Sequence, residues 1–149
     1  MSISKIAKNI KSDKSDFPPV HLWEPELCIG QEITINREGD WLYNNSPIKN
    51  TKLVKLFSSV LRNDNGSYFL VTPYEKVPVF SELAPYVITD FDISDNIITL
   101  HTNLDYSFPL NDQNTTRLVK YQNTIIPLVH VRNGIDGFFN RATYYKLVD

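Results

Sequence analysis

The spacing of hydrophobic residues changes near position 66 of this chain. The segment before it carries an apolar stripe at three- and four-residue intervals, made of Leu53, Val54, Leu56, Phe57, Val60 and Leu61. Such a stripe is typical of an amphipathic helix that covers a sheet. We expect this helix to begin between Ser46 and Thr51 and to end near Asn63. It should bury Leu53, Phe57 and Val60 against strands.

Strands are predicted on both sides of this helix. Residues 32–44 alternate apolar and polar side chains around a Glu-Gly-Asp interruption, which predicts a hairpin. After position 66, Pro, Asn and Asp separate five segments that read as strands: SYFLVT, KVPVFS, PYVITDFDI, IITLHTN and IIPLVHV. Pro78 has no backbone N–H to donate, so we expect its strand to lie at a sheet edge or to be bulged.

Residues 129–141, VHVRNGIDGFFNR, combine an Asn-Gly pair with a histidine, an aspartate and two arginines. Asn-Gly between alternating hydrophobic residues predicts a tight hairpin. The loop can have two residues, Asn133-Gly134, or three, with Gly134 in the left-handed conformation. The three-residue loop keeps one face wholly apolar, and we favour it because a one-residue slip flips every side chain. It places His130 and Asp136 together on the opposite face.

Length and composition fit one compact domain, or two small halves that share a core. Hydrophobic residues make up 42% and charged residues 21% of the 149 positions, as in globular proteins. Cys28 is the single cysteine, which excludes an internal disulfide and favours a reducing compartment. Apolar runs stay far below the roughly 20 residues of a membrane span, so a cytoplasmic location is expected. Ile3, Ile6 and Ile10 predict a helix in the basic N-terminal segment that packs on the domain or frays.

Charge is distributed unevenly, although the net charge is only −2. Between Lys76 and Arg117 there are acidic residues and no cation, whereas basic residues dominate after Arg117. We favour acidic and basic strands that face each other or water; a basic patch for an anionic ligand is the alternative. Nucleic acid is an unfavoured partner, because a protein's affinity for it comes mostly from neutralising phosphates and this chain is acidic overall. Stacking on exposed Tyr and Trp beside the C-terminal basic residues would be needed for it.

Residues suited to catalysis or metal binding are sparse. His130 beside Asp136 would supply a base and its orienting group, but no serine or cysteine lies nearby in a recognisable nucleophile motif. A plain cross-strand surface pair is therefore favoured. His21 and His101 lie far from His130 in sequence, so neither a metal nor another cofactor is expected.

Polar residues at connections are better candidates for a binding surface. Residues 71–77, VTPYEKV, place charged side chains between two predicted strands, and a turn with a charged tip is the competing interpretation. Arg141 begins the final helix, where unpaired backbone N–H groups favour anions. A structural pair with the acids between Glu82 and Asp112 is the alternative for this arginine. The predicted ligand-binding residues are Trp23, Thr72, Glu75, Lys76, Arg132, which lies in the hairpin turn, and Arg141.

Several short motifs, taken in order, resemble one bacterial family. They are PPVHLWEPELC, EGDWLYNNSPI with the LVKLFSSVL helix, YFLVTPYEK with the later APY, and VRNGIDGFFNRATYYKLV. The chain is similar to domain-of-unknown-function family 1285 from about Pro18 to Val148. Asn45 stands where that family suggests a glycine, and Asn tolerates the same left-handed geometry. Asn50 replaces an expected arginine, which argues against an anion role for that helix start.

The resemblance implies two similar small α+β halves sharing a core: residues 18–80, after a basic segment 1–17, and residues 81–149. The second half would be a bent antiparallel sheet with a terminal helix, similar to a pleckstrin-homology fold. It implies a non-catalytic binding or regulatory module, in signalling, for a protein or small anionic ligand at the junction of the halves. The alternative is a hydrolase-type enzyme that uses Glu75 or the His130–Asp136 pair. The oligomeric state and the ligand's identity are not specified by these patterns.

Overall fold

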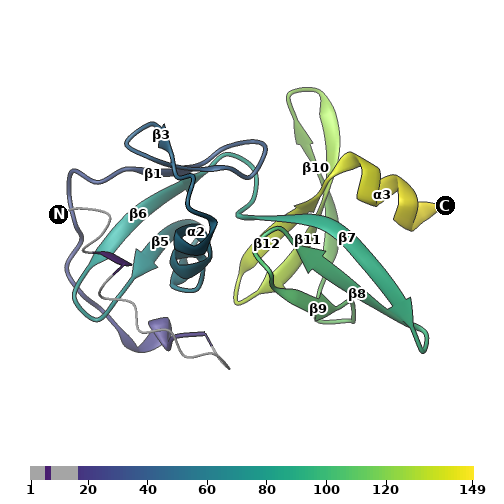
Figure 1. The fold of residues 1–149 in the computed structure, drawn as a ribbon, viewed down its shortest axis with the longest axis horizontal. Helices are drawn as coiled ribbons and strands as arrows, with labels where there is room; N and C mark the ends of the chain where they lie inside the picture. Colours follow the sequence, from purple (N-terminus) through teal and green to yellow (C-terminus); the bar gives the residue numbers. More distant parts are fainter. Residues whose placement is uncertain (1–5, 8–16) are drawn as a thin grey trace. The chain divides into compact units, whose positions relative to one another are not determined.

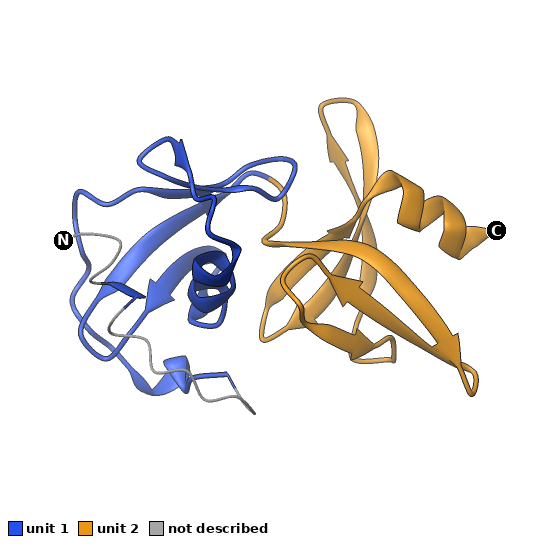
Figure 2. Ribbon diagram, in the orientation of Figure 1, with its two compact units in different colours: residues 1–82 blue, residues 83–149 orange. Residues whose placement is uncertain are grey.

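The computed structural model describes residues 6–7 and 17–149 and divides into two compact units (Figure 2). Unit 1 comprises residues 1–82 and unit 2 residues 83–149. Within unit 1, the Glu82 N–H donates to the Ile35 carbonyl at 2.9 Å. Of the expected N-terminal helix, Ile6 and Ala7 are helical and Ile6 is buried; its other residues lie outside the described part.

Unit 1 contains a six-stranded sheet with the strand order β3-β2-β1-β6-β5-β4 (Figure 1). Its strands are β1 (Ile33–Ile35), β2 (Trp41–Tyr43), β3 (Ser46–Pro47), β4 (Leu61–Asp64), β5 (Ser67–Val71) and β6 (Lys76–Ser81). Neighbouring strands are antiparallel except β1 and β6, which run parallel. The 3-10 helix η1 (Val20–Leu22) precedes the sheet, and α2 (Thr51–Ser58) lies between β3 and β4.

Helix α2 begins where the sequence predicts it but ends earlier. The Asn50 side chain caps it by accepting from the Lys52 and Leu53 N–H groups, at 3.1 and 3.3 Å. The expected extension to Asn63 was wrong, because residues 61–64 pair with β5. The stripe is buried at Phe57, whereas Leu53 is only half-buried.

Pro78 lies in an internal strand, so, of the two expectations of an edge strand or a bulge, the edge strand was wrong. β6 pairs with β5 on one side and with β1 on the other. The Thr72 N–H donates to the Glu75 carbonyl, so this pair is hydrogen-bonded. Hydrogen-bonded and non-hydrogen-bonded pairs alternate along β5 and β6, so Pro78 lies in a non-hydrogen-bonded pair and its nitrogen faces β1. β1 pairs from Ile33, opposite Val79. An N–H at position 78 would point to the chain just before β1, where no strand pairing occurs. A proline is therefore tolerated there.

Unit 2 contains a second six-stranded sheet with the order β10-β11-β12-β7-β8-β9 (Figure 1). Its strands are β7 (Tyr86–Ser94), β8 (Ile97–Thr102), β9 (Ser107–Pro109), β10 (Thr116–Tyr121), β11 (Thr124–Arg132) and β12 (Ile135–Phe139). Again only the first and last strands, β7 and β12, pair in parallel. Helix α3 (Arg141–Val148) follows β12. Two mixed sheets with α2 and α3 confirm the predicted α+β class.

The β11–β12 hairpin combines both predicted registers. Asn133 and Gly134 have φ angles of 47° and 77° and form a two-residue turn between Arg132 and Ile135. A bulge after His130 then shifts the pairing, so the body of the hairpin has the register with one apolar face. Local turn geometry and burial are thus both satisfied.

Candidate functional site

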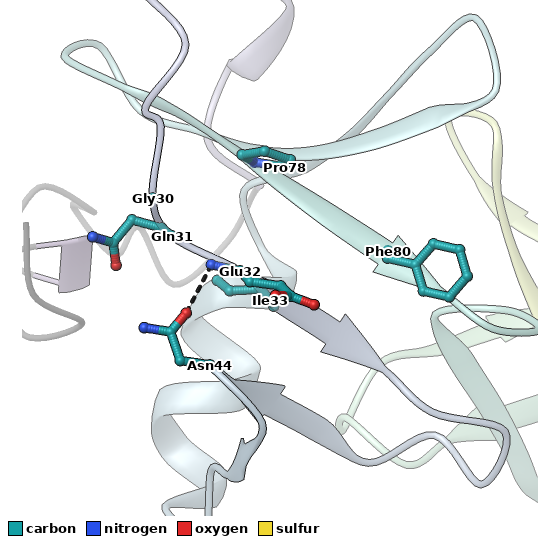
Figure 3. Close-up of a pocket in the computed structure, with 7 residues that line it drawn as sticks. All are labelled: Gly30, Gln31, Glu32, Ile33, Asn44, Pro78 and Phe80. Atoms are coloured by element: carbon teal, nitrogen blue, oxygen red, sulfur yellow. Dashed lines mark hydrogen bonds between the residues drawn. The ribbon is translucent and has the colours of Figure 1, made fainter.

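A pocket of about 400 Å³ opens on unit 1 beside the start of β1 (Figure 3). It is lined by Gly30, Gln31, Glu32, Ile33, Asn44, Pro78 and Phe80. β1 and β6 form the parallel seam of the sheet, so the pocket lies where the two three-stranded halves of the sheet meet.

The pocket arises from a mismatch in chain length along this seam. Leu27 bridges to Lys76, and Ile33 pairs with Val79. The chain from Leu27 to Ile33 therefore takes six residue steps beside a part of β6 that takes only three. The extra residues before β1 form a loop that departs from β6. Gly30, with a φ of 93°, turns this loop. Pro78 lies opposite the loop and has no N–H that would hold the chain against β6.

Amide and carboxylate groups line one side of the pocket. The Asn44 side-chain oxygen accepts from the Glu32 N–H at 3.0 Å, and the Tyr43 hydroxyl donates to the Gln31 side-chain oxygen. These bonds use the amide oxygens, so the NH₂ groups of Asn44 and Gln31 can donate to a ligand. Figure 3 shows both amides on one side and the Glu32 side chain extending toward the Phe80 side.

Apolar side chains form the opposite wall. Pro78 and Phe80 alternate with buried neighbours on β6 and therefore point to the outer face of the sheet. The Phe80 residue is 64% exposed, and Ile29 in the pocket loop is 88% exposed. An exposed aromatic ring beside a hollow is a typical anchor for a partner's apolar group.

An ionic cluster holds the chain that leads into the pocket. One Arg62 nitrogen donates to the carbonyls of Val20 and Trp23 at 2.8 and 2.7 Å. Two others bind the Asp64 carboxylate, which also pairs with Lys76 at 3.0 Å. The hydrogen bond from Arg62 lowers the pKa of Asp64, and the same bond raises the pKa of Arg62. These contacts anchor η1 and the loop to sheet residues far away in sequence.

One family model and two solved structures match the chain. The model of the DUF1285 N-terminal domain, a domain of unknown function, matches residues 18–84. The crystal structure of a DUF1285 family protein from Silicibacter pomeroyi DSS-3 is 31% identical, with a TM-score of 0.87 over 98% of this chain and 82% of that one. The chain belongs to the DUF1285 family. A DUF1285 family protein from Shewanella baltica OS155 is 29% identical, with a TM-score of 0.65 over 78% of this chain and 89% of that one. No curated protein matches the chain.

In this DUF1285 chain, the predicted site residues of unit 1 have structural contacts. The Thr72 hydroxyl accepts from the N–H groups of Tyr74 and Glu75, at 3.3 and 3.2 Å. Both Thr72 and Glu75 are buried in this turn. Lys76 is half-buried, pairs with Asp64 and lies 4.2 Å from the Phe69 ring centroid. The half-buried Trp23 is held through its backbone, as described above for Arg62.

The two predicted arginines of unit 2 differ in exposure. Arg132, expected in the hairpin turn, is buried and donates through Nε to the Tyr86 hydroxyl at 3.1 Å. Burial raises the pKa of Tyr86, and the charge of Arg132 opposes that shift. Arg141 is exposed and pairs with none of the described residues. The alternative ion pair between Arg141 and an acid of residues 82–112 is therefore not formed.

His130 and Asp136 face each other across the hairpin but bind different groups. The His130 Nε2 atom accepts from the Gly134 N–H at 3.0 Å, and Asp136 pairs with Arg117 at 2.6 Å. In the described part of the chain, no three His, Cys, Asp or Glu side chains are placed to hold a metal ion. The same described residues contain no helix long and apolar enough to cross a membrane.

Sequence reasoning did not identify the pocket residues of this DUF1285 chain. Gly30, Asn44 and Phe80 carry no catalytic motif, and they lie in three separate segments. Two local signals point to the place: a glycine just before a strand, and a proline inside a hydrophobic strand. Neither signal shows that Pro78 faces the loop around Gly30.

Proposed function

We propose that this DUF1285 protein is a binding module whose unit 1 pocket receives a segment of another protein. The observation that carries the proposal is the wall of half-buried Pro78 and exposed Phe80, which faces amide donors and a carboxylate around one hollow. Apolar walls with a few placed polar groups are typical of binding pockets. Binding of this kind requires no catalytic group.

Charge favours a partner segment that contains a cation. Glu32 is the one charged residue among those that line the pocket, and Glu26 is exposed on the preceding chain. An anionic ligand would be repelled by these carboxylates, whereas Lys or Arg beside an apolar residue would be attracted. The proposed ligand is therefore an extended segment with an apolar side chain for the Phe80 wall and a basic residue for Glu32.

A small anionic ligand would have to bind elsewhere, and Arg141 supports that second candidate. Arg141 is exposed, and it begins an eight-residue helix that Asn140 caps by accepting from the Thr143 N–H at 2.8 Å. We propose that unit 2 is a pleckstrin-homology-like module that acts in signalling. Its support is a mainly antiparallel sheet followed by a terminal helix. A cytoplasmic location, favoured by the single cysteine, completes the proposal.

Peptide selection on the full chain tests the pocket. A displayed library of random peptides should yield sequences with Lys or Arg beside Leu, Ile, Phe or Trp. Replacing Phe80 by Ala should weaken the selected peptides by roughly tenfold or more, as expected for an aromatic anchor. Glu32→Gln should weaken them less and reduce their salt dependence. Fluorescence anisotropy gives the dissociation constants, and amide NMR shifts locate the bound peptide.

Tyr74→Ala is the matched control, because Tyr74 is an exposed aromatic residue of unit 1 outside the pocket lining. It should leave peptide affinity unchanged. Peptides that bind Phe80→Ala as tightly as the original chain would exclude the pocket as their site. Shifts at Arg141 on titration with inorganic phosphate would instead favour the anion candidate.

A further inference from the structure

Three polar side chains on adjacent strands of unit 2 form a connected row. His101 on β8 contacts the Ser107 hydroxyl on β9 through Nδ1, at 2.7 Å. Its Nε2 atom contacts the Asp92 carboxylate on β7, at 2.6 Å. All three point to the outer face of the sheet, since they alternate with the buried Phe91 and Leu100. Neither the pocket nor the predicted sites include these residues.

Two local irregularities of the backbone bring the row together. A bulge between Ile88 and Asp90 shifts the register of β7, so the strand's acidic residues share a face with His101. Without this shift, Asp92 would point to the inner face, because side chains alternate along a strand. The Thr102 hydroxyl accepts from the N–H groups of Leu104 and Tyr106 and so closes the β8–β9 turn that sets Ser107 opposite His101.

The hydrogen bonds orient the imidazole for proton transfer. A carboxylate only accepts, so Nε2 of a neutral His101 carries the proton donated to Asp92, and Nδ1 keeps its lone pair. That lone pair faces the Ser107 hydroxyl at hydrogen-bond distance. A serine beside an imidazole base that a carboxylate orients is the arrangement of nucleophilic acyl transfer.

A backbone donor lies next to the same hydroxyl. The Thr102 N–H bonds to the Tyr106 carbonyl, and the Leu110 N–H bonds to the Ile98 carbonyl. The His101–Ser107 pair between them is therefore of the non-hydrogen-bonded type, and the Ser107 N–H points away from β8. β9 ends the strand order of unit 2, so this N–H faces the sheet edge. A nucleophile's own N–H can stabilise the oxyanion of a tetrahedral intermediate.

We propose that Ser107, His101 and Asp92 form a nucleophilic centre that hydrolyses small carboxylic esters with good leaving groups. Ser107 Oγ bonds to the ester carbonyl carbon while its proton passes to His101 Nδ1. The bond from that carbon to the leaving oxygen then breaks, and the leaving group takes the electron pair and the proton from His101 Nδ1. Water next attacks the acyl-serine, gives its proton to His101 and releases the carboxylic acid, and the proton returns to Ser107 Oγ.

The open position of the row limits the substrate to activated esters. The Asp92 side chain is 74% exposed and the His101 side chain 33% exposed, so water screens their charges. The rate enhancement should accordingly fall well below that of an enclosed triad.

Hydrolysis of p-nitrophenyl acetate by the full chain tests the proposal. We expect an initial burst of p-nitrophenolate and an acetyl group on the Ser107 peptide in mass spectrometry. Ser107→Ala and His101→Gln should each abolish the burst and lower the rate by about tenfold or more. Asp92→Asn should lower the rate by a smaller factor, since an exposed carboxylate mainly orients the ring. Ser107→Cys should still be acetylated at position 107, which guards against misfolding of the alanine variant.

Controls separate the centre from unspecific imidazole catalysis. His21→Gln removes an exposed histidine of unit 1, and Ser94→Ala removes an exposed serine two residues beyond Asp92 on β7. Both variants should keep the burst and the rate within about twofold. A Ser107→Ala variant that hydrolyses at the original rate, or acetylation confined to other residues, would overturn the proposal. The three side chains would then form only a cross-strand hydrogen-bonded row.

Discussion

The two units repeat one strand topology and differ in what lies at its seam. Each is built from two three-stranded antiparallel meanders, joined by parallel pairing of the first and last strands. In unit 1 this seam opens at Pro78, and the pocket lies there. In unit 2 the corresponding strands pair directly, with Gly137 opposite Tyr86. The same framework is therefore opened in one copy and closed in the other.

The units also differ in how the chain crosses from the third strand to the fourth. These strands lie at opposite ends of each sheet order. Unit 1 uses residues 48–60, which include α2, whereas unit 2 uses only residues 110–115, with a turn closed by the Asn114 N–H and the Asn111 carbonyl. Edge strands of a flat six-stranded sheet lie about 24 Å apart, and the seven steps from Pro109 to Thr116 would reach about that far only if fully extended. The Asn111–Asn114 turn shortens this path well below that span. The sheet of unit 2 must therefore curl toward a half-barrel.

Removing the ring that supports unit 1 should have the largest effect. Phe57 lies on the buried face of α2 and is fully buried, so Phe57→Ala should lower the free energy of unfolding by about 3–5 kcal/mol. Trp23 and Trp41 are the two tryptophans of the chain and both belong to unit 1. Their fluorescence in a urea titration therefore follows unit 1 alone. Phe80→Ala, at an exposed position, should change stability by less than about 0.5 kcal/mol. A loss below about 1 kcal/mol for Phe57→Ala would contradict its place in the core.

Widening the closed seam of unit 2 should have the next largest effect. A Cβ atom at Gly137 would lie 3.1 Å from both Tyr86 Cβ and Val131 Cγ2. Gly137→Ala should therefore cost about 1–3 kcal/mol through overpacking. Far-UV circular dichroism during urea unfolding measures this loss, while tryptophan fluorescence reports whether unit 1 is affected. Ser94→Ala is the control in unit 2. An unchanged midpoint for Gly137→Ala would show that the seam can open at little cost.

Acidification should weaken the anchor of unit 1 with a smaller effect. The pKa of Asp64 is lowered in the folded chain, chiefly by the hydrogen bond from Arg62. Its stabilisation is therefore fully present above the unfolded pKa of about 3.9 and is lost as pH falls through the lower folded value. Asp64→Asn should cost about 1–2 kcal/mol at pH 7, and less at pH 2, because protonation of the carboxylate weakens its bonds to Arg62 and Lys76.

The exposed Asp112 offers a comparison in unit 2, and Asp112→Asn should change stability little at either pH. Urea titrations of both variants across this pH range measure the difference. An Asp64→Asn deficit as large at pH 2 as at pH 7 would contradict the ionic origin of the anchor.

Local patterns predicted most elements because side-chain periodicity and turn residues act over a few positions. The start of α2 falls within the predicted range, with Asn50 as its cap, and the predicted Asn-Gly turn has positive φ angles. The end of α2 did not follow, because Leu61 pairs with Leu70 and is thereby drawn into β4. Strand pairing within the adjacent β4–β5 hairpin outweighed a weak helical preference.

The candidate site was predicted less well, since residue type does not reveal burial. Thr72, Glu75 and Arg132 have suitable chemistry, yet the fold buries all three. Arg141 is exposed, as an anion contact requires. The row from Asp92 through His101 to Ser107 was missed because a bulge decides which face Asp92 occupies.

The sequence by itself determined the α+β class, most strands, the approximate start of α2 and the family resemblance, because these depend on neighbouring residues. Tertiary structure alone decided the parallel seams, the internal position of Pro78 and the pocket. The pocket depends on the offset between the Leu27–Lys76 bridge and the Ile33–Val79 pair, which joins segments more than forty residues apart. Such an offset is set by the packing of the whole sheet, and no local propensity encodes it.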